Sequence, residues 1–145
     1  WRVGYLAGPA EMIAAAARVH NSVNGSVNSA VQRAALVALT QCKNDVKRMY
    51  DVYRERRQLM MEGLYAIPEL SLNEPEGAFY CFPSYSLPIP AIDMVALLRE
   101  QGIAVRPGSE FGAAGERHLR LSYAASNEAI VEGVHRLKRA LAGLN

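Results

Sequence analysis

Cysteine and histidine are scarce in this sequence, and their placement excludes the common structural uses of both. The two cysteines, Cys42 and Cys81, lie far apart, and the three histidines are scattered without any metal-ligand spacing. Structural zinc sites need such ligands in closely spaced pairs, and a disulfide framework needs more cysteines. We therefore expect no metal site and no disulfide framework, and a cytoplasmic location fits this cysteine usage best.

Long apolar runs and a large excess of one charge are also missing. No stretch approaches the roughly 18 consecutive apolar residues that a membrane span needs. The formal net charge is only +2, so we expect neither nucleic acid nor a membrane as a partner. Of the 145 residues 50% are hydrophobic and 21% are charged, which is typical of a globular chain that can bury a core.

Lysine is rare among the basic residues. Of the 16 basic residues only three are lysines, namely Lys43, Lys47 and Lys138. Each lies in polar sequence with a helical pattern. Such lysines are usually solvated side chains. The first residue is Trp1 rather than methionine, and patterned sequence begins at once, so we expect a fragment of a longer protein.

The first half of the chain predicts one strand followed by helices. Residues 1–8 alternate as in a strand or strand end, and Pro9 suits the first position of a helix that extends to about His20. The polar segment 21–29 breaks the pattern and offers several possible N-caps, Ser26 among them. From there to Gly63 a 3.6-residue period continues without proline or internal glycine.

A single helix over this stretch would be too long for one compact domain. About 37 residues at 1.5 Å each give roughly 55 Å, whereas a 145-residue globule is only about 40 Å across. The helix therefore kinks, near Lys43, or bridges two domains. We place a domain boundary inside it, so that residues 1–40 are a remnant of one domain, 41–62 continue the connecting helix, and 63–145 form a small C-terminal domain.

The C-terminal segment alternates between strands and helices, which predicts an α/β protein whose small domain is an α+β layer. We expect three or four strands, with two helices on one face of the sheet. One helix spans 92–101 and stops at Gly102, and another follows the N-cap Ser126. The second helix should bury one apolar stripe: Ile130, Val134, Leu137 and Leu141.

The strand His118–Ala124 carries the most informative residue. Leu119, Leu121 and Tyr123 alternate with Arg120 and Ser122, so one face is apolar and the other holds a guanidinium. An arginine fork suits a bidentate carboxylate or phosphate. The strand alone also fits a polar face that simply meets water.

The residues by themselves indicate no further catalytic machinery. We find no proton-transfer pair, nucleophile triad or phosphate-binding glycine loop, and the segment Arg106–Gly112 lacks phosphate-loop spacing. Taken alone, that segment is typical of a plain turn.

Short motifs along the chain nevertheless match one family in order and approximate spacing. They are Trp1-Arg2-Val3-Gly4-Tyr5, Gly77-Ala78-Phe79-Tyr80, Gly102-Ile103-Ala104-Val105, Pro107-Gly108, Phe111-Gly112 and Arg120-Leu121-Ser122-Tyr123-Ala124. Together they resemble the C-terminal part of the class I aminotransferases, which are fold-type I enzymes that use pyridoxal 5′-phosphate. The resemblance implies that the long helix links a large cofactor-binding domain to the small domain.

The resemblance also implies roles for individual residues. Arg2 matches the arginine that pairs with the cofactor phosphate, and Arg120 matches the arginine that binds the substrate α-carboxylate. We expect Phe79, Tyr80 and Phe111 to be core or wall residues rather than contacts. The family is usually dimeric, so we expect a homodimer of the parent protein.

The catalytic lysine of the family is the main departure. It lies a short distance before the position of Trp1, and neither Lys43, Lys47 nor Lys138 stands in a matching motif, so this chain has no catalytic residue and should be inactive alone. The parent should be an aminotransferase that moves an amino group from an amino acid to a 2-oxo acid. Two alternatives remain: a related lyase that uses the same cofactor, and the effector-binding domain of a transcription regulator.

Overall fold

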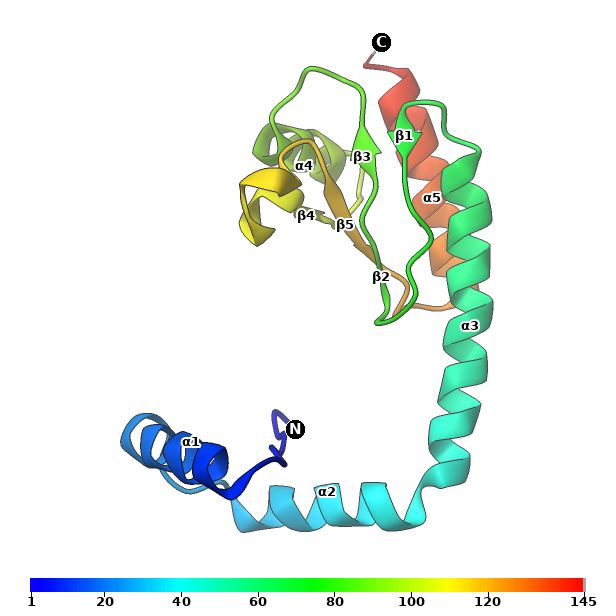
Figure 1. The fold of residues 1–145 in the computed structure, drawn as a ribbon. Coiled ribbons are helices and arrows are strands. Elements are labelled where there is room, and N and C mark those ends of the chain that lie inside the picture. The colour runs from blue at the N-terminus through cyan, green and yellow to red at the C-terminus, as the bar shows by residue number, and fades with distance from the viewer. Residues whose placement is uncertain (145) are drawn as a thin grey trace. The chain divides into compact units, whose positions relative to one another are not determined.

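The computed structural model describes residues 1–144 and divides into two compact units, Trp1–Arg48 and Met49–Asn145. The division falls inside a helix, and each unit is described by itself. Figure 1 labels the helices and strands. The helices are α1 (Ala10–Val23), α2 (Ser29–Gln41), α3 (Lys43–Tyr65), α4 (Ala91–Glu100) and α5 (Asn127–Ala142). The strands are β1 (Leu70–Ser71), β2 (Tyr80–Cys81), β3 (Ser84–Tyr85), β4 (Arg106–Pro107) and β5 (Leu119–Ser122).

The first unit corrects three local predictions. Residues 1–8 form no strand, because an alternating segment becomes a strand only where another strand pairs with it. Pro9 is the N-cap of α1 rather than its first residue, since its ψ of 141° is extended. The N-cap of α2 is Asn28, whose side chain accepts hydrogen bonds from the N–H groups of Ala30 and Val31, and not Ser26.

The long periodic stretch is two helices rather than one. Cys42 separates α2 from α3 with φ −104° and ψ 26°, directly before the predicted kink near Lys43. The 23 residues of α3 give a helix of about 35 Å, and the division between the two units falls inside it, after Arg48.

The second unit contains two small antiparallel sheets. Strands β1 and β3 form one, and the other has the order β2-β5-β4. A bridge between Ser84 and His118 links the two. The strands are short: within residues 77–82 only β2 pairs, β4 is two residues long, and β3 covers only residues 84–85. Backbone pairing, which periodicity does not encode, sets these limits.

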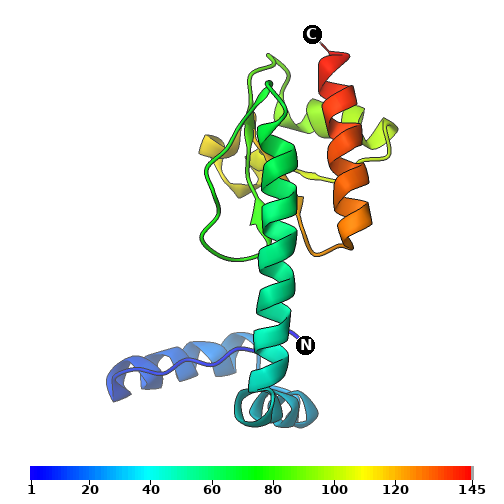
Figure 2. The same ribbon diagram turned by 90° about the vertical axis from the view of Figure 1, so that its right-hand side faces the viewer.

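Helices α3, α4 and α5 surround the core of this unit. The four residues of the predicted α5 stripe are all buried, Ser126 caps α5 by accepting from Ala129 N–H, and Gly102 follows α4 with a positive φ of 73°. Figure 2 shows α3 and α5 side by side. They approach closely at Gly63, because a Cβ placed there would lie 2.7 Å from the Cγ1 atom of Val134.

Candidate functional site

Strand β5 lies between β2 and β4 and fixes the direction of Arg120. Leu119 and Leu121 are buried, whereas Arg120 is half-buried and Ser122 is exposed. This confirms the alternation predicted from the sequence. The apolar residues anchor the strand in the core, so the guanidinium must lie on the opposite face of the sheet.

Two aromatic rings cover the guanidinium of Arg120. The guanidinium carbon lies 4.4 Å from the ring centre of Tyr80 and 4.6 Å from that of Phe111. Tyr80 belongs to β2 and Phe111 follows β4, so the rings come from the two neighbours of β5 on opposite sides. Tyr80 and Phe111 are thus in direct contact with the candidate site residue, a contact that the sequence pattern did not reveal. In the sequence, the only sign of this contact was one aromatic residue near each of two different strands.

The N–H groups of Arg120 remain available to a ligand. Its register partner on β4, Arg106, is ion-paired with Glu110, with Nε 2.7 Å from a carboxylate oxygen. None of the ion pairs of residues 1–144 involves Arg120. A desolvated guanidinium needs an anionic partner or water, and a planar carboxylate fits its fork.

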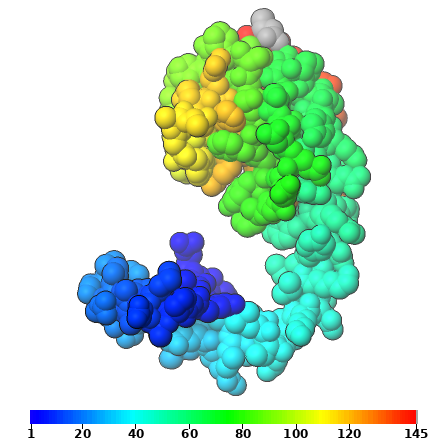
Figure 3. All heavy atoms as spheres, viewed as in Figure 1, coloured from blue at the N-terminus to red at the C-terminus, as the bar shows by residue number. Residues whose placement is uncertain are grey.

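The segment between β4 and β5 is more specialised than a plain turn. It forms two short 3₁₀ turns, Gly108–Phe111 and Ala113–Gly115, which lie at the surface of the second unit, shown in yellow in Figure 3. The backbones of Gly108 and Gly115 touch so closely that a Cβ on either residue would overlap the carbonyl oxygen of the other. Gly108 N–H also donates to the carbonyl of His118 at 2.8 Å. This closure places Phe111 against Arg120.

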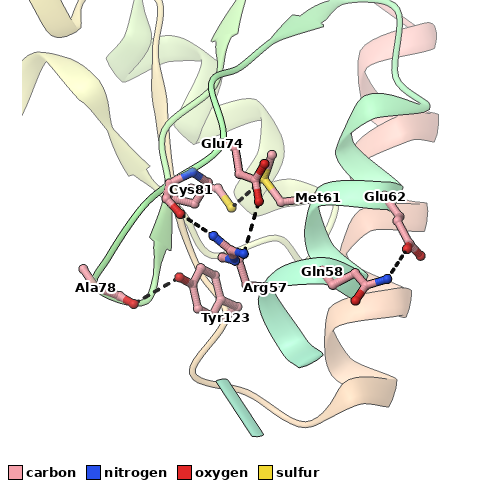
Figure 4. Close-up of polar contacts among 9 residues, drawn as sticks. Arg57, Gln58, Met61, Glu62, Glu74, Ala78, Cys81 and Tyr123 are labelled. Atoms are coloured by element: carbon pink, nitrogen blue, oxygen red, sulfur yellow. Dashed lines mark hydrogen bonds and ion pairs between the residues drawn. The ribbon is translucent and has the colours of Figure 1, made fainter. Parts of the chain in front are cut away.

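Arg57 holds the segment that leads into β2, as Figure 4 shows. It donates to the carbonyl of Pro75 at 2.7 Å and forms an ion pair with Glu74 at 3.1 Å. Beside it, the Tyr123 hydroxyl donates to the carbonyl of Ala78 at 3.0 Å. These contacts fix the approach to Tyr80. No motif in the sequence distinguishes Arg57.

Cys81 is part of the same buried region. Its thiol lies 3.6 Å from the sulfur of Met61, and burial raises the pKa of Cys81 to about 11, with nearby Arg57 opposing the shift. Burial also raises the pKa of Tyr123. Both groups therefore keep their protons at neutral pH and serve structural roles.

The other predicted site residue, Arg2, belongs to the first unit. It is exposed and has a positive φ of 58°, which is unusual for a residue with a Cβ. The ion pairs of residues 1–144 do not involve Arg2. Its guanidinium is thus available for an anion such as a phosphate.

Other classes of site have no counterpart in the described part of the chain. Lys43, Lys47 and Lys138 are exposed on helices. No group of three potential metal ligands converges within residues 1–144. None of the helices formed by these residues has the length and apolar character to cross a membrane.

Comparison with known proteins identifies the family of this chain. Residues 1–137 match the family model described as aminotransferase class I and II. An aspartate aminotransferase of Pyrococcus horikoshii is 35% identical over 147 residues, covering 99% of this chain and 38% of that protein. An aspartate/prephenate aminotransferase of Thermus thermophilus is 40% identical over 146 residues, covering 97% of this chain and 37% of that protein.

Solved structures give the same result for the fold. The aspartate aminotransferase from Thermus thermophilus with maleate superposes with a TM-score of 0.86 at 38% identity, covering 97% of this chain and 37% of that one. The α+β fold of the second unit and the family match over residues 1–137 indicate the same family. The chain belongs to the class I and II aminotransferase family, and it spans somewhat over a third of the length of these relatives.

Proposed function

We propose that the protein carrying this chain is a pyridoxal-phosphate-dependent aminotransferase, which moves an amino group from an amino acid to a 2-oxo acid. The observation that carries the proposal is the guanidinium of Arg120, held between two rings and without an ion-pair partner among the described residues. Family membership supports the reaction class.

Arg120 would bind the α-carboxylate of the amino acid through both of its terminal N–H groups. This binding fixes the bond between Cα and its hydrogen relative to the cofactor ring, which is a contribution of orientation rather than of proton transfer. Pyridoxal phosphate supplies, when bound, the electron-withdrawing ring that makes the α-hydrogen acidic. The amino acid and the 2-oxo acid share the carboxylate, so one arginine serves both half-reactions.

Arg2 would contact the phosphate of the cofactor. Its exposed guanidinium, outside every ion pair of the described residues, fits a doubly charged oxyanion. A positive φ at a residue with a Cβ costs free energy and is enriched at functional sites, which is a second reason to assign it a role.

The chain contributes binding groups and no catalytic residue in this proposal. The family lysine would lie outside the sequence, since Lys43, Lys47 and Lys138 match no lysine motif. Residues 1–40 would belong to the large cofactor-binding domain, residues 41–62 to the connecting helix, and residues 63–145 to the small domain. We further propose a cytoplasmic homodimer, on the grounds of two free cysteines and the usual state of the family.

The test is an amino-exchange assay on the whole protein that carries this sequence. The purified protein, loaded with pyridoxal phosphate, is incubated with aspartate and 2-oxoglutarate, because the Pyrococcus relative is named an aspartate aminotransferase, and then with other amino acids. The expected result is stoichiometric formation of a new amino acid and a new 2-oxo acid. Release of ammonia or a cleaved side chain would instead indicate a lyase. Absence of turnover together with a DNA-binding segment would indicate a regulator.

A further inference from the structure

Arg120 is one member of a continuous series of side-chain contacts along the β2-β5-β4 sheet. We name it the Arg120 cluster. Of its ring pairs, Phe82 and His118 are stacked, whereas Phe82 and Phe111 meet edge to face. The guanidinium carbon of Arg120 lies 4.4 Å from the ring centre of Tyr80 and 4.6 Å from that of Phe111. The distances between ring centres are 4.4 Å for Phe79 and Tyr80, 6.0 Å for Phe111 and Phe82, and 5.1 Å for Phe82 and His118. Every ring next to the guanidinium is thus supported by a second ring.

The burial of apolar surface alone does not account for this arrangement. Phe111 is 51% exposed, and Phe82 and Phe79 are also exposed. These rings gain only part of the free energy that a buried phenylalanine would gain. The contact that the two flanking pairs share is the guanidinium between them.

We propose that Tyr80 and Phe111 are positioning residues that fix the plane of the Arg120 guanidinium and make it select a planar carboxylate over a tetrahedral anion. The inference rests on the proposed function, in which Arg120 binds the α-carboxylate. It goes further by assigning a task to two residues that line the arginine rather than the substrate.

The fixed plane of the guanidinium follows from how a guanidinium interacts with aromatic rings. It stacks with its flat face on the face of an aromatic ring, which leaves its N–H donors pointing outward in its own plane. An arginine without such neighbours loses considerable rotamer freedom when it binds a ligand. Because the rings of Tyr80 and Phe111 lie 4.4 Å and 4.6 Å from the guanidinium carbon, much of that ordering precedes binding.

The preference for a planar carboxylate follows from the shape of the ligand. A carboxylate can lie in the guanidinium plane, with both oxygens accepting N–H bonds. A sulfonate or phosphonate of the same charge carries a third oxygen outside that plane. In this cluster the third oxygen would approach the face of Tyr80 or Phe111, where the ring quadrupole is negative and repels it.

The test compares two monoanions that differ only in this respect: butanoate and propane-1-sulfonate. Each has one anionic group, so Arg120 is the common docking point, and calorimetric titration measures binding without any turnover. We compare the whole protein carrying this chain with Tyr80→Leu and Phe111→Leu, which remove a ring, and with Tyr80→Phe and Phe111→Tyr, which keep it. Tyr65→Leu is the matched control, because Tyr65 is an exposed tyrosine at the end of α3.

We expect the leucine variants to weaken butanoate binding by about fivefold or more, while the ring-keeping variants and Tyr65→Leu stay within about twofold. The preference for butanoate over propane-1-sulfonate should shrink in the leucine variants only. Thermal melting followed by circular dichroism establishes that each variant is folded. The ring-keeping variants give a result even where a leucine variant does not fold.

Two outcomes would overturn the proposal. One is unchanged butanoate binding in folded leucine variants, and the other is equal weakening in the ring-keeping variants. Arg120→Lys, titrated in parallel, separates this failure from that of the proposed function. If Arg120→Lys loses butanoate binding and the leucine variants do not, the positioning role is wrong and the carboxylate clamp stands. If Arg120→Lys binds butanoate as tightly as the parent, both are wrong.

Discussion

Arg106 lies directly opposite Arg120 in the register of β4 and β5, yet only Arg106 has a carboxylate partner, Glu110. Two like charges at this position repel each other unless one is neutralised. Glu110 lies on the same 3₁₀ turn as Phe111. One short turn therefore neutralises the first arginine and covers the second.

Replacing Glu110 by glutamine should increase the positive potential around Arg120. We expect anionic ligands such as butanoate to bind about two- to threefold more tightly at low ionic strength, with the difference vanishing at high salt because the pair is exposed. Calorimetric titration at two salt concentrations measures this. Glu100→Gln on α4 is the control and should leave the affinity for butanoate unchanged at both salt concentrations. Weaker binding in Glu110→Gln would show that Glu110 holds Phe111 in place rather than screening charge.

Replacing Arg120 by lysine should lower kcat/KM about tenfold or more, which corresponds to at least about 1.4 kcal/mol of transition-state stabilisation. A lysine keeps the charge and loses the planar fork and the stacking. Steady-state kinetics of the whole protein measure the change, with Arg139→Lys near the end of α5 as the matched control. Unchanged kinetics would exclude the clamp role.

Replacing Arg2 by alanine should chiefly weaken retention of the cofactor. The phosphate would lose a charge-assisted hydrogen bond, which contributes roughly 1.5–3 kcal/mol. Cofactor loss during dialysis, followed by absorbance, is the measurement. Arg18→Ala on α1 is the control, and equal retention in both variants would remove Arg2 from the site.

Two glycines in helices give a paired test of core packing. Gly63→Ala places a methyl group against Val134 and should destabilise the protein by about 1–3 kcal/mol, less the gain in helix propensity. Gly133→Ala on α5 meets no atom within 4 Å and should stabilise the protein by up to about 1 kcal/mol. Urea unfolding curves measure both. Similar effects of the two changes would contradict the close approach of α3 and α5.

The buried thiol of Cys81 makes stability sensitive to alkali. Burial raises its pKa from 9.0 to about 11, so the unfolded chain releases the proton at lower pH than the folded protein does. Its contribution to stability is complete below pH 9 and is lost as the pH rises toward 11. Urea unfolding at several pH values measures the slope of stability against pH, and Cys81→Ala should flatten it.

At pH 8, alkylation by iodoacetamide should reach Cys42, which is half-exposed, well before Cys81.

Much of the second unit was predictable because its signals are local. The apolar alternation of β5, the buried stripe of α5 and the N-cap Ser126 each depend on residues a few positions apart, and all three are confirmed. Family membership was likewise predictable, since motifs from Trp1 to Ala124 follow one order, and the family match covers residues 1–137.

The remaining features depend on pairing between distant segments. The alternating residues 1–8 have no strand partner, and β4 begins only at Arg106. Whether an extended segment becomes a strand depends on its neighbour, which periodicity cannot specify.

The sequence by itself determined that an arginine would stand on the polar face of a buried strand, because a side-chain period of two leaves no other choice once the leucines are in the core. Only the tertiary structure decided what surrounds it. The order β2-β5-β4 brings Tyr80 and Phe111, 31 positions apart, to opposite sides of Arg120. Strand order arises from long-range contacts, and no local pattern contains it.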